Sequence, residues 1–289
     1  MKFKNLLITD IMKLKSTPFL WVHLLAPILA LIVFLSYFSV STWDPIMKQK
    51  TYMTAMCMAF PVLIAVITSM VAENEYAAGN YQNLLGTYDK KWSSLLSKYL
   101  VLVALGGLST LIGVMGFYLG FSQMTLALPL ITYVVLTFIL IGCSLFLYAF
   151  HLFLSLRFSK SVSIGIGIFE ALIAALFRTG MGDGRWPFFP CSWSIRFTWF
   201  TMMQKNNGMV IPDPLMGQGV ALCVGVTMLS ILMLMVWFEN WEAFNIYGIA
   251  YNGIYISLEL TRKSVLPEYR EKLDNALHDL IAQNGNYNI

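Results

Sequence analysis

Charged residues are scarce in this chain of 289 residues: Lys, Arg, Asp and Glu account for 12% of it, whereas hydrophobic residues account for 58%. A soluble globular domain usually carries about 25% charged residues, so this composition excludes an ordinary water-soluble fold. The apolar residues must face lipid as well as one another. The sequence therefore predicts an all-α polytopic membrane protein.

Several catalytic and metal-binding patterns are also missing. The four cysteines lie far apart, without the Cys-x-x-Cys spacing of zinc or redox sites, and we assign them to packing. They are Cys57, Cys143, Cys191 and Cys223. No Gly-x-x-x-x-Gly-Lys-Ser/Thr phosphate loop occurs, so the chain is not itself a P-loop ATPase. Gly-x-Ser-x-Gly and His-Glu-x-x-His are absent as well. We expect no catalytic residue, no metal and no cofactor in this chain.

Six apolar runs are long enough to cross a hydrocarbon core of about 30 Å, which takes about 20 helical residues. They cover residues 18–40, 51–72, 99–121, 126–156, 161–177 and 217–238. Together they define a transmembrane domain over residues 18–238. In the third run, Gly116-x-x-x-Gly120 predicts a close helix-packing face.

The basic residues indicate the orientation, because cytoplasmic loops hold back Lys and Arg during insertion. With the N-terminus inside, 13 of the 19 Lys and Arg residues lie on the cytoplasmic face and six on the other. We therefore expect a multi-pass protein of the cell membrane with both termini in the cytoplasm. The net charge of +4 follows from this topology and gives no reason to expect a nucleic-acid partner.

An amphipathic helix is predicted before the first span, over residues 1–17. Asp10, Lys13 and Lys15 occupy its polar faces. Apolar side chains recur at helical spacing at Phe3, Leu7, Ile11 and Leu14. Such a helix lies on the inner membrane surface with its lysines toward anionic lipid. The alternative, an ordinary positively charged flank, explains the lysines but not the apolar stripe.

One long polar stretch, residues 73–98, separates the second and third spans. It opens with Glu73 and Glu75, breaks at Gly79 and ends at Lys98. Between these positions lie Tyr81, Leu84 and Leu85. A short, structured cytoplasmic loop of this kind is what a membrane domain needs if a soluble motor is to push on it. We therefore expect this stretch to carry the function.

The fifth and sixth spans are joined by a long aromatic loop, residues 178–216. Its tryptophans are Trp186, Trp193 and Trp199. Tryptophan is common in helices that lie in the membrane–water interface, so anchoring of this loop in the outer interface alone accounts for these rings. The other interpretation is an outer surface that contacts an amphiphilic substrate.

Glu170 is the only acid within the predicted spans. An ionised carboxylate at that depth costs about 2.5 to 3.5 kcal/mol on insertion scales, so we expect it to face the protein interior, a partner subunit or water. It either lines a path for a cationic substrate or is protonated and hydrogen-bonded between helices. His23 and His151 have no acidic partner at catalytic spacing, and we expect structural roles for both.

The tail, residues 239–289, has a different pattern. Alternating apolar residues on either side of Asn252-Gly253 predict a β-hairpin over residues 244–260. A helical pattern follows over residues 267–283. The expected fold is thus an all-α transmembrane domain with a small cytoplasmic ββα tail. A unit this small does not fold alone, so we expect it to pack on the membrane domain, a second subunit or a motor.

These features together resemble the type-2 ABC exporter permeases. The resemblance covers residues 1–242 and includes Glu-x-Glu-x-x-x-Gly at residues 73–79 and Leu-Leu-Ser-Lys at residues 95–98. Within that family, Asp-x-x-Lys-Leu-Lys-Ser-Thr at residues 10–17 and Phe-Pro-Cys-Ser-Trp at residues 189–193 look like the lantibiotic-immunity and bacitracin-type permeases of Gram-positive bacteria.

The resemblance implies that residues 73–98 contain a coupling helix that sits in a groove of a separate ABC ATPase subunit, which would bind ATP and Mg²⁺. It also implies that the chain is half of a transport path in the lipid bilayer, completed by a copy of itself or by a paralogous permease. The exporter would drive an amphiphilic peptide such as a lantibiotic out of the membrane and so protect the cell from this bacteriocin.

Two other functions stay open at this point. The nearer one keeps the transporter and changes its cargo to a drug, a lipid or a polysaccharide. The more distant one is a membrane enzyme or scaffold without a motor, which would use Glu170, His151 and Arg157 near the inner face.

Overall fold

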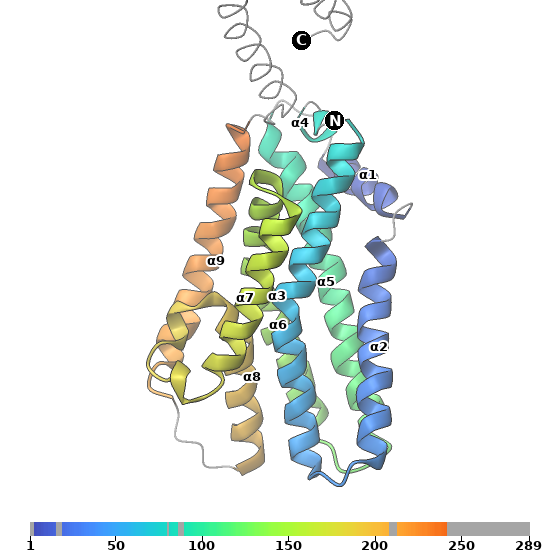
Figure 1. The fold of residues 1–289 in the computed structure, drawn as a ribbon, viewed down its shortest axis with the longest axis vertical. Helices are drawn as coiled ribbons and strands as arrows, with labels where there is room; N and C mark the ends of the chain where they lie inside the picture. Colours follow the sequence, from blue (N-terminus) through green and yellow to red (C-terminus); the bar gives the residue numbers. More distant parts are fainter. Residues whose placement is uncertain (1–2, 16–18, 80, 86–89, 208–212, 242–289) are drawn as a thin grey trace, which may run out of the picture. The chain divides into compact units, whose positions relative to one another are not determined.

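Helices make up almost all of the chain that the computed structural model describes, which is residues 3–15, 19–79, 81–85, 90–207 and 213–241. Within these ranges there are nine α-helices, two short 3₁₀-helices and no strand. Six of the α-helices are long and apolar enough to cross a membrane, which confirms the predicted all-α fold with six spans (Figure 1). The predicted hairpin and the predicted helix of the tail lie outside the described residues.

The spanning helices are α2 (Phe19–Val40), α3 (Pro45–Ala77), α5 (Lys91–Ser122), α6 (Leu130–Arg157), α7 (Lys160–Phe177) and α9 (Met216–Glu239). The second predicted span, residues 51–72, is shorter than α3 at both ends, because an apolar window marks only the part of a helix that fits the hydrocarbon. Since α3 continues to Ala77, Glu73 and Glu75 also lie inside a spanning helix. Within the bounds of the observed helices, Glu170 is thus joined by these two acids and by Glu239, the last residue of α9.

The early start of α3 has a local cause. The Asp44 carboxylate accepts hydrogen bonds from the backbone N–H groups of Ile46 and Met47 at 2.8 and 3.2 Å. Pro45 occupies the first helical position, where its missing N–H and fixed φ are no cost. Asp-Pro is thus a helix start that lies several residues outside the apolar run.

Two short helices, α1 (Phe3–Lys15) and α4 (Gln82–Leu85), lie at the same end of the helix bundle, which we call the α4 end (Figure 1). The helix predicted over residues 1–17 is confirmed for its described part. Within α1, Leu6 is buried against the bundle, whereas Ile11 and Met12 are exposed. Exposed apolar side chains on α1 are what a helix that contacts a membrane surface requires.

Helix α3 is central and packs against α6, α7 and α8, while α2 packs mainly on α5. Glycines allow α5 and α2 to approach closely. A Cβ at Gly116 would lie 2.6 Å from Cδ1 of Leu31, and one at Gly120 would lie 2.5 Å from Cδ1 of Leu35. The predicted Gly-x-x-x-Gly packing face is therefore confirmed, and its partner is α2.

The long loop between α7 and α9 folds into the bundle. It contains η1 (Gly180–Gly182), η2 (Trp186–Phe188) and α8 (Pro190–Asn207), which lie away from the α4 end (Figure 1). Helix α8 packs on α3, α6 and α7, and Trp186 and Trp193 are almost completely buried. The loop does form short helices, but these two rings pack inside the protein instead of anchoring it in the membrane interface.

Gly167 allows α7 to approach α3. A Cβ at Gly167 would lie 2.8 Å from the carbonyl oxygen of Pro61, whereas a Cβ at Gly165 would have nothing within 4 Å. We expect Gly167→Ala to destabilise the protein by about 1–3 kcal/mol, because the clash is with backbone that cannot yield. Gly165→Ala is the matched control, and it should be neutral or stabilising by up to about 1 kcal/mol, since alanine favours helix. Thermal unfolding in detergent measures both, and equal midpoints would contradict the prediction.

Candidate functional site

A buried ionic cluster joins three helices at the α4 end. Lys98 of α5 donates through Nζ to Oε1 of Glu75 in α3 at 2.6 Å and to Oδ1 of Asp10 in α1 at 3.1 Å. Ser97 Oγ donates to the other carboxylate oxygen of Asp10 at 2.5 Å. The ion-paired side chains are at most 10% exposed. We call these four residues the Lys98 cluster.

Burial makes this cluster a rigid connection. Taking an ion out of water costs several kcal/mol, and the cost is offset only when each charge is paired and hydrogen-bonded. Here two carboxylates share one ammonium group, and Asp10 has a second donor in Ser97. The cluster therefore fixes α1, α3 and α5 relative to one another beside α4.

Two of the described residues between α3 and α4 have positive φ. Gly79 has φ 130° and Tyr81 has φ 65°. The backbone N–H of Tyr81 donates to the carbonyl of Glu75 at 3.2 Å, and the carbonyl of Tyr81 accepts from the N–H groups of Leu84 and Leu85, both at 2.9 Å. Positive φ is costly for a residue with a Cβ, so tertiary packing must hold Tyr81 in place.

Two aromatic rings supply that packing. The Tyr81 ring lies 5.7 Å from the ring of Tyr76 and 5.3 Å from that of Trp241, centroid to centroid. Burial raises the pKa of the Tyr81 phenol above its ordinary value of 10.0, and Tyr76, Glu73 and Glu75 act in the same direction. The phenol is therefore neutral at physiological pH and serves as a packing group.

Polar contacts attach α4 and the start of α5 to their neighbours. Ser94 Oγ donates to the carbonyl of Leu84 at 2.6 Å. Glu239, at the end of α9, accepts through Oε2 from the backbone N–H of Trp92 at 2.9 Å. The first N–H groups of a helix have no partner within it and favour negative charge, so Glu239 caps α5 from outside. Five helices, α1, α3, α4, α5 and α9, thus meet at this site.

Not every residue predicted for coupling reaches the surface. Leu84 is 3% exposed, so its side chain packs into the bundle, and Leu85 is half-buried. Gly79 and Glu73 are exposed, and Glu73 pairs with Lys160 of α7 at 3.1 Å through side chains that are half exposed. An exposed pair of this kind contributes little to stability. The surface that a partner can touch therefore includes Glu73, Gly79 and Leu85.

The structure describes the side chain of only one of the three residues predicted for the polar faces of the N-terminal helix. Asp10 is buried in the Lys98 cluster and holds α1 to the bundle. The side chains of Lys13 and Lys15 lie outside the described part of the chain.

A second polar group lies between α6 and α7. His151 Nε2 is 2.8 Å from Glu170 Oε2, and His151 Nδ1 is 3.1 Å from Ser163 Oγ. His151 therefore has an acidic partner, contrary to the expectation from spacing, because α7 folds back along α6. Ser–His–Glu is also the order of a nucleophilic triad, but Ser163 and His151 are both 0% exposed, so no substrate reaches the hydroxyl. The contacts satisfy buried polar groups between two helices.

The tryptophans predicted for a substrate path differ in exposure. Trp186 Nε1 donates to Asp213 Oδ2 at 2.9 Å, and Trp193 Nε1 donates to the carbonyl of Pro187 at 2.8 Å. Both rings are buried with their N–H groups satisfied inside the protein, so neither lines an open path in this conformation. Trp199 is half-buried and has cationic side chains over its ring.

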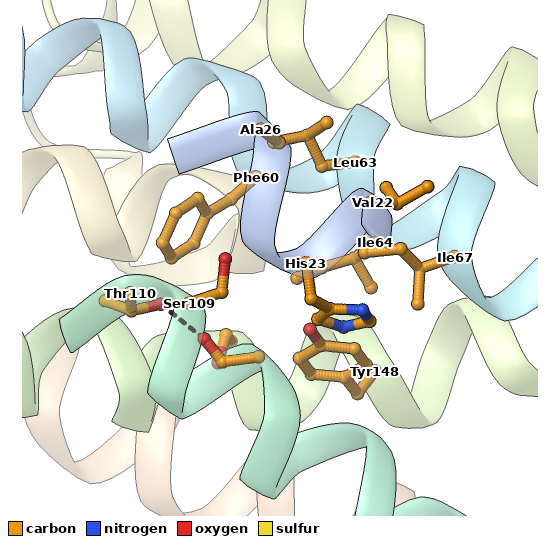
Figure 2. A pocket seen from close by; sticks show the side chains of 12 residues that line it. Val22, His23, Ala26, Phe60, Leu63, Ile64, Ile67, Ser109, Thr110 and Tyr148 are labelled. Atoms are coloured by element: carbon orange, nitrogen blue, oxygen red, sulfur yellow. Dashed lines mark hydrogen bonds between the residues drawn. The ribbon is translucent and has the colours of Figure 1, made fainter. Parts of the chain in front are cut away.

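A small cavity lies between α2, α3, α5 and α6 (Figure 2). Its lining is largely apolar but includes His23, Ser109, Thr110 and Tyr148, and in Figure 2 the imidazole of His23 lies beside the Tyr148 ring. The cavity has a volume of about 40 Å³. A space of that size holds about one or two water molecules, so it is not a site for a peptide.

Comparison with known protein families identifies the class of this membrane protein. Residues 6–176, more than half of the chain, match the family described as ABC-2 family transporter protein. No match was found among curated proteins or among solved structures. The chain therefore belongs to the ABC-2 transporter family and is a multi-pass membrane component of an ABC transporter. Membership implies an ABC ATPase as its partner. The matched range contains the whole Lys98 cluster.

Sequence reasoning missed several residues that complete the site. Ser97 had a local signal, because it directly precedes Lys98 in the Leu-Leu-Ser-Lys pattern. Ser94 and Glu239 had none. Glu239 contacts Trp92 across 147 positions of the chain, and no local pattern joins residues so far apart.

Two lysines provide a matched test of the Lys98 cluster. We expect Lys98→Met to destabilise the protein by about 3–5 kcal/mol, because it leaves two buried carboxylates without their cation. Lys160→Met breaks only the exposed pair with Glu73 and should change stability by less than about 1 kcal/mol. Denaturant unfolding in detergent measures both changes.

A third variant distinguishes the loss of the pair from the loss of the lysine side chain. Lys98→Met combined with Asp10→Asn and Glu75→Gln removes all three charges, so it should recover part of the lost stability. Equal stability of Lys98→Met and Lys160→Met would show that the cluster does not hold the helices together.

Proposed function

We propose that this chain is the permease subunit of an ATP-driven exporter, and that its cargo is a lantibiotic or a similar amphiphilic antimicrobial peptide. Two findings support the assignment as an exporter subunit: membership of the ABC-2 transporter family, and the Lys98 cluster, which joins α1, α3 and α5 beside α4. The proposed substrate is based on the resemblance of residues 10–17 and 189–193 to lantibiotic-immunity permeases. Expelling the peptide would protect the cell from a membrane-active bacteriocin.

In this proposal the α4 end faces the cytoplasm of a Gram-positive cell. Its described lysines include Lys90, Lys91 and Lys160, and cytoplasmic ends are enriched in such residues. Helix α1 and the end of α9 lie at the same end, as an even number of spans requires (Figure 1). Both termini would then be cytoplasmic, on the side where the ATPase subunit binds ATP and Mg²⁺.

The ATPase would push on α4, and the contacts at the site offer a route for that movement. The hydrogen bond from Tyr81 N–H to the Glu75 carbonyl connects the turn to α3, and the bond from Ser94 to the Leu84 carbonyl connects α4 to α5. The Lys98 cluster then obliges α3 and α5 to move together. Displacement of packed elements with discrete contacts is the physical basis for long-range coupling.

A second permease would complete the transport path. In the most apolar parts of α2 and α7, only 11% and 17% of the residues are buried within the chain. Apolar helix surfaces of this extent support contact with lipid and with another subunit, either a copy of this chain or a paralogue. The peptide would leave the bilayer as the paired membrane domains change their interface.

The alternatives have less support. A drug, a lipid or a polysaccharide as cargo changes only the substrate of the same machine, and survival tests against a panel of lantibiotics distinguish it. A motor-free membrane enzyme that used His151 would need an accessible imidazole, but His151 and its partner Ser163 are both 0% exposed between α6 and α7. Arg157, the third residue of that interpretation, lies over the ring of Phe158 at 5.8 Å.

Two glycines at positive φ give a test of coupling, because one lies beside α4 and the other lies away from it. Gly79 (φ 130°) and Gly184 (φ 76°) both have positive φ and nothing within 4 Å of a built Cβ, but only Gly79 lies beside α4. We expect Gly79→Ala to reduce substrate-stimulated ATP hydrolysis by about tenfold or more. A Cβ at this φ costs about 1–3 kcal/mol, so the turn should change its conformation and misplace the contact with the ATPase. Gly184→Ala should retain most of the stimulation. The measurement uses the permease and its ATPase in proteoliposomes with a lantibiotic.

The assay first requires the partner to be found. Purification of the tagged chain from its host in mild detergent, followed by mass spectrometry, should recover an ABC ATPase. Full stimulation in Gly79→Ala would disprove the coupling role of the turn but not the family. Repeated recovery of the chain without any ATPase would count against the exporter itself.

A further inference from the structure

Two cationic side chains lie over one indole ring at the side of the bundle away from α4. Lys50 Nζ is 5.1 Å and Arg178 Cζ is 4.4 Å from the ring centroid of Trp199. Lys50 belongs to the second turn of α3, Arg178 directly follows α7, and Trp199 belongs to α8. All three residues are half-buried. We call them the Trp199 site.

Neither cation of this site has a carboxylate in direct contact among the described residues. The two cationic groups are no farther apart than the sum of their distances to the ring, so they repel each other. The Asp44 carboxylate attracts the Lys50 ammonium group through space, but it forms no ion pair with it and accepts two backbone N–H groups at the start of α3. Asp183 is paired with Arg196 at 2.8 Å. Among the described residues, no carboxylate forms an ion pair with Lys50 or Arg178.

The hydrogen-bond donors of the site also lack oxygen acceptors. Arg178 Nε is buried and has no hydrogen-bond partner among the described atoms, which is costly for a polar group. The ammonium group of Lys50 donates to the thioether sulfur of Met203 at 2.9 Å, and such a sulfur is a weak acceptor. The site therefore has two cations and a buried donor, and it lacks the oxyanion that would satisfy them.

We propose that the Trp199 site binds the phosphate group of an anionic membrane phospholipid. Phosphate oxygens accept strong charge-assisted hydrogen bonds from Arg and Lys, and indole rings favour the depth of lipid headgroups. Lys50 and Arg178 lie near helix ends, where a spanning helix reaches that depth. All three side chains of the site are half-buried, so part of each remains open to a ligand from outside the chain. Arg178 and Trp199 lie beyond the residues that match the transporter family.

The test compares lipid binding by the full chain, purified in detergent, by native mass spectrometry. The probes are phosphatidylglycerol and diacylglycerol with the same acyl chains, which differ in the phosphoglycerol headgroup. We expect phosphatidylglycerol to bind the wild type, and Lys50→Gln and Arg178→Gln each to weaken this binding by about fivefold, as the loss of one basic residue predicts. Arg178→Lys keeps the charge and should retain most of the affinity.

Arg185→Gln is the matched control, because Arg185 is exposed and belongs to the same loop as Arg178. Its binding of phosphatidylglycerol should equal that of the wild type. Equal weakening in Arg185→Gln would show nonspecific attraction and overturn the site, as would unchanged binding in both Lys50→Gln and Arg178→Gln. Diacylglycerol that binds as well as phosphatidylglycerol would exclude recognition of phosphate.

Inorganic phosphate distinguishes the source of the anion. Competition by millimolar inorganic phosphate for the lipid site would support recognition of the phosphate group. Binding of inorganic phosphate to a protein that does not bind phosphatidylglycerol would overturn the assignment to lipid. Thermal unfolding of each variant identifies one that fails to fold, and Lys50→Gln and Arg178→Gln test the site independently.

Discussion

An ionised side chain inside an apolar bundle has no water around it, so it must find its partners within the protein. That constraint places the helix ends of this permease. Lys98 is held by two carboxylates, whereas the buried Lys48 donates to the carbonyls of Phe38 and Ser41 at 2.8 and 2.7 Å. Arg196 likewise donates to the carbonyl of Phe177, the last residue of α7, and to that of Thr179 just beyond it. Each buried cation takes acceptors from a neighbouring helix or its end, and thereby fixes where two elements meet.

Polar contacts concentrate near the ends of the helices, while much of the packing between the ends depends on shape. Glycines at positions 116, 120 and 167 let helices approach until side chains or backbone touch. Dispersion and close packing hold such contacts, because lipid gives no hydrophobic force between helices.

The Lys98 cluster and the Trp199 site differ in how many acceptors their cationic side chains have within the chain. At the α4 end, the Lys98 ammonium group is paired with carboxylates on two helices of the same chain. At the Trp199 site the donors outnumber the acceptors, which favours an anion from outside. The same principle, that buried polar groups need partners, thus underlies both the stability expected of the Lys98 cluster and the lipid proposed for the Trp199 site. The His151–Glu170 pair is an intermediate case, since it is satisfied but lies where Glu170 retains 12% of its side-chain exposure.

The sequence by itself determined the class, the six spans, the helix before them and the polar stretch of residues 73–98, because these depend on composition and on patterns within about 20 residues. It misplaced the ends of α3, since Asp44 and Pro45 start the helix outside the apolar run. Only the tertiary structure decided that Asp10 meets Lys98 across 88 positions, that His151 meets Glu170, and that Trp186 and Trp193 face inward. Such contacts arise when helices pack side by side, and hydropathy along the chain holds no information about which helices become neighbours.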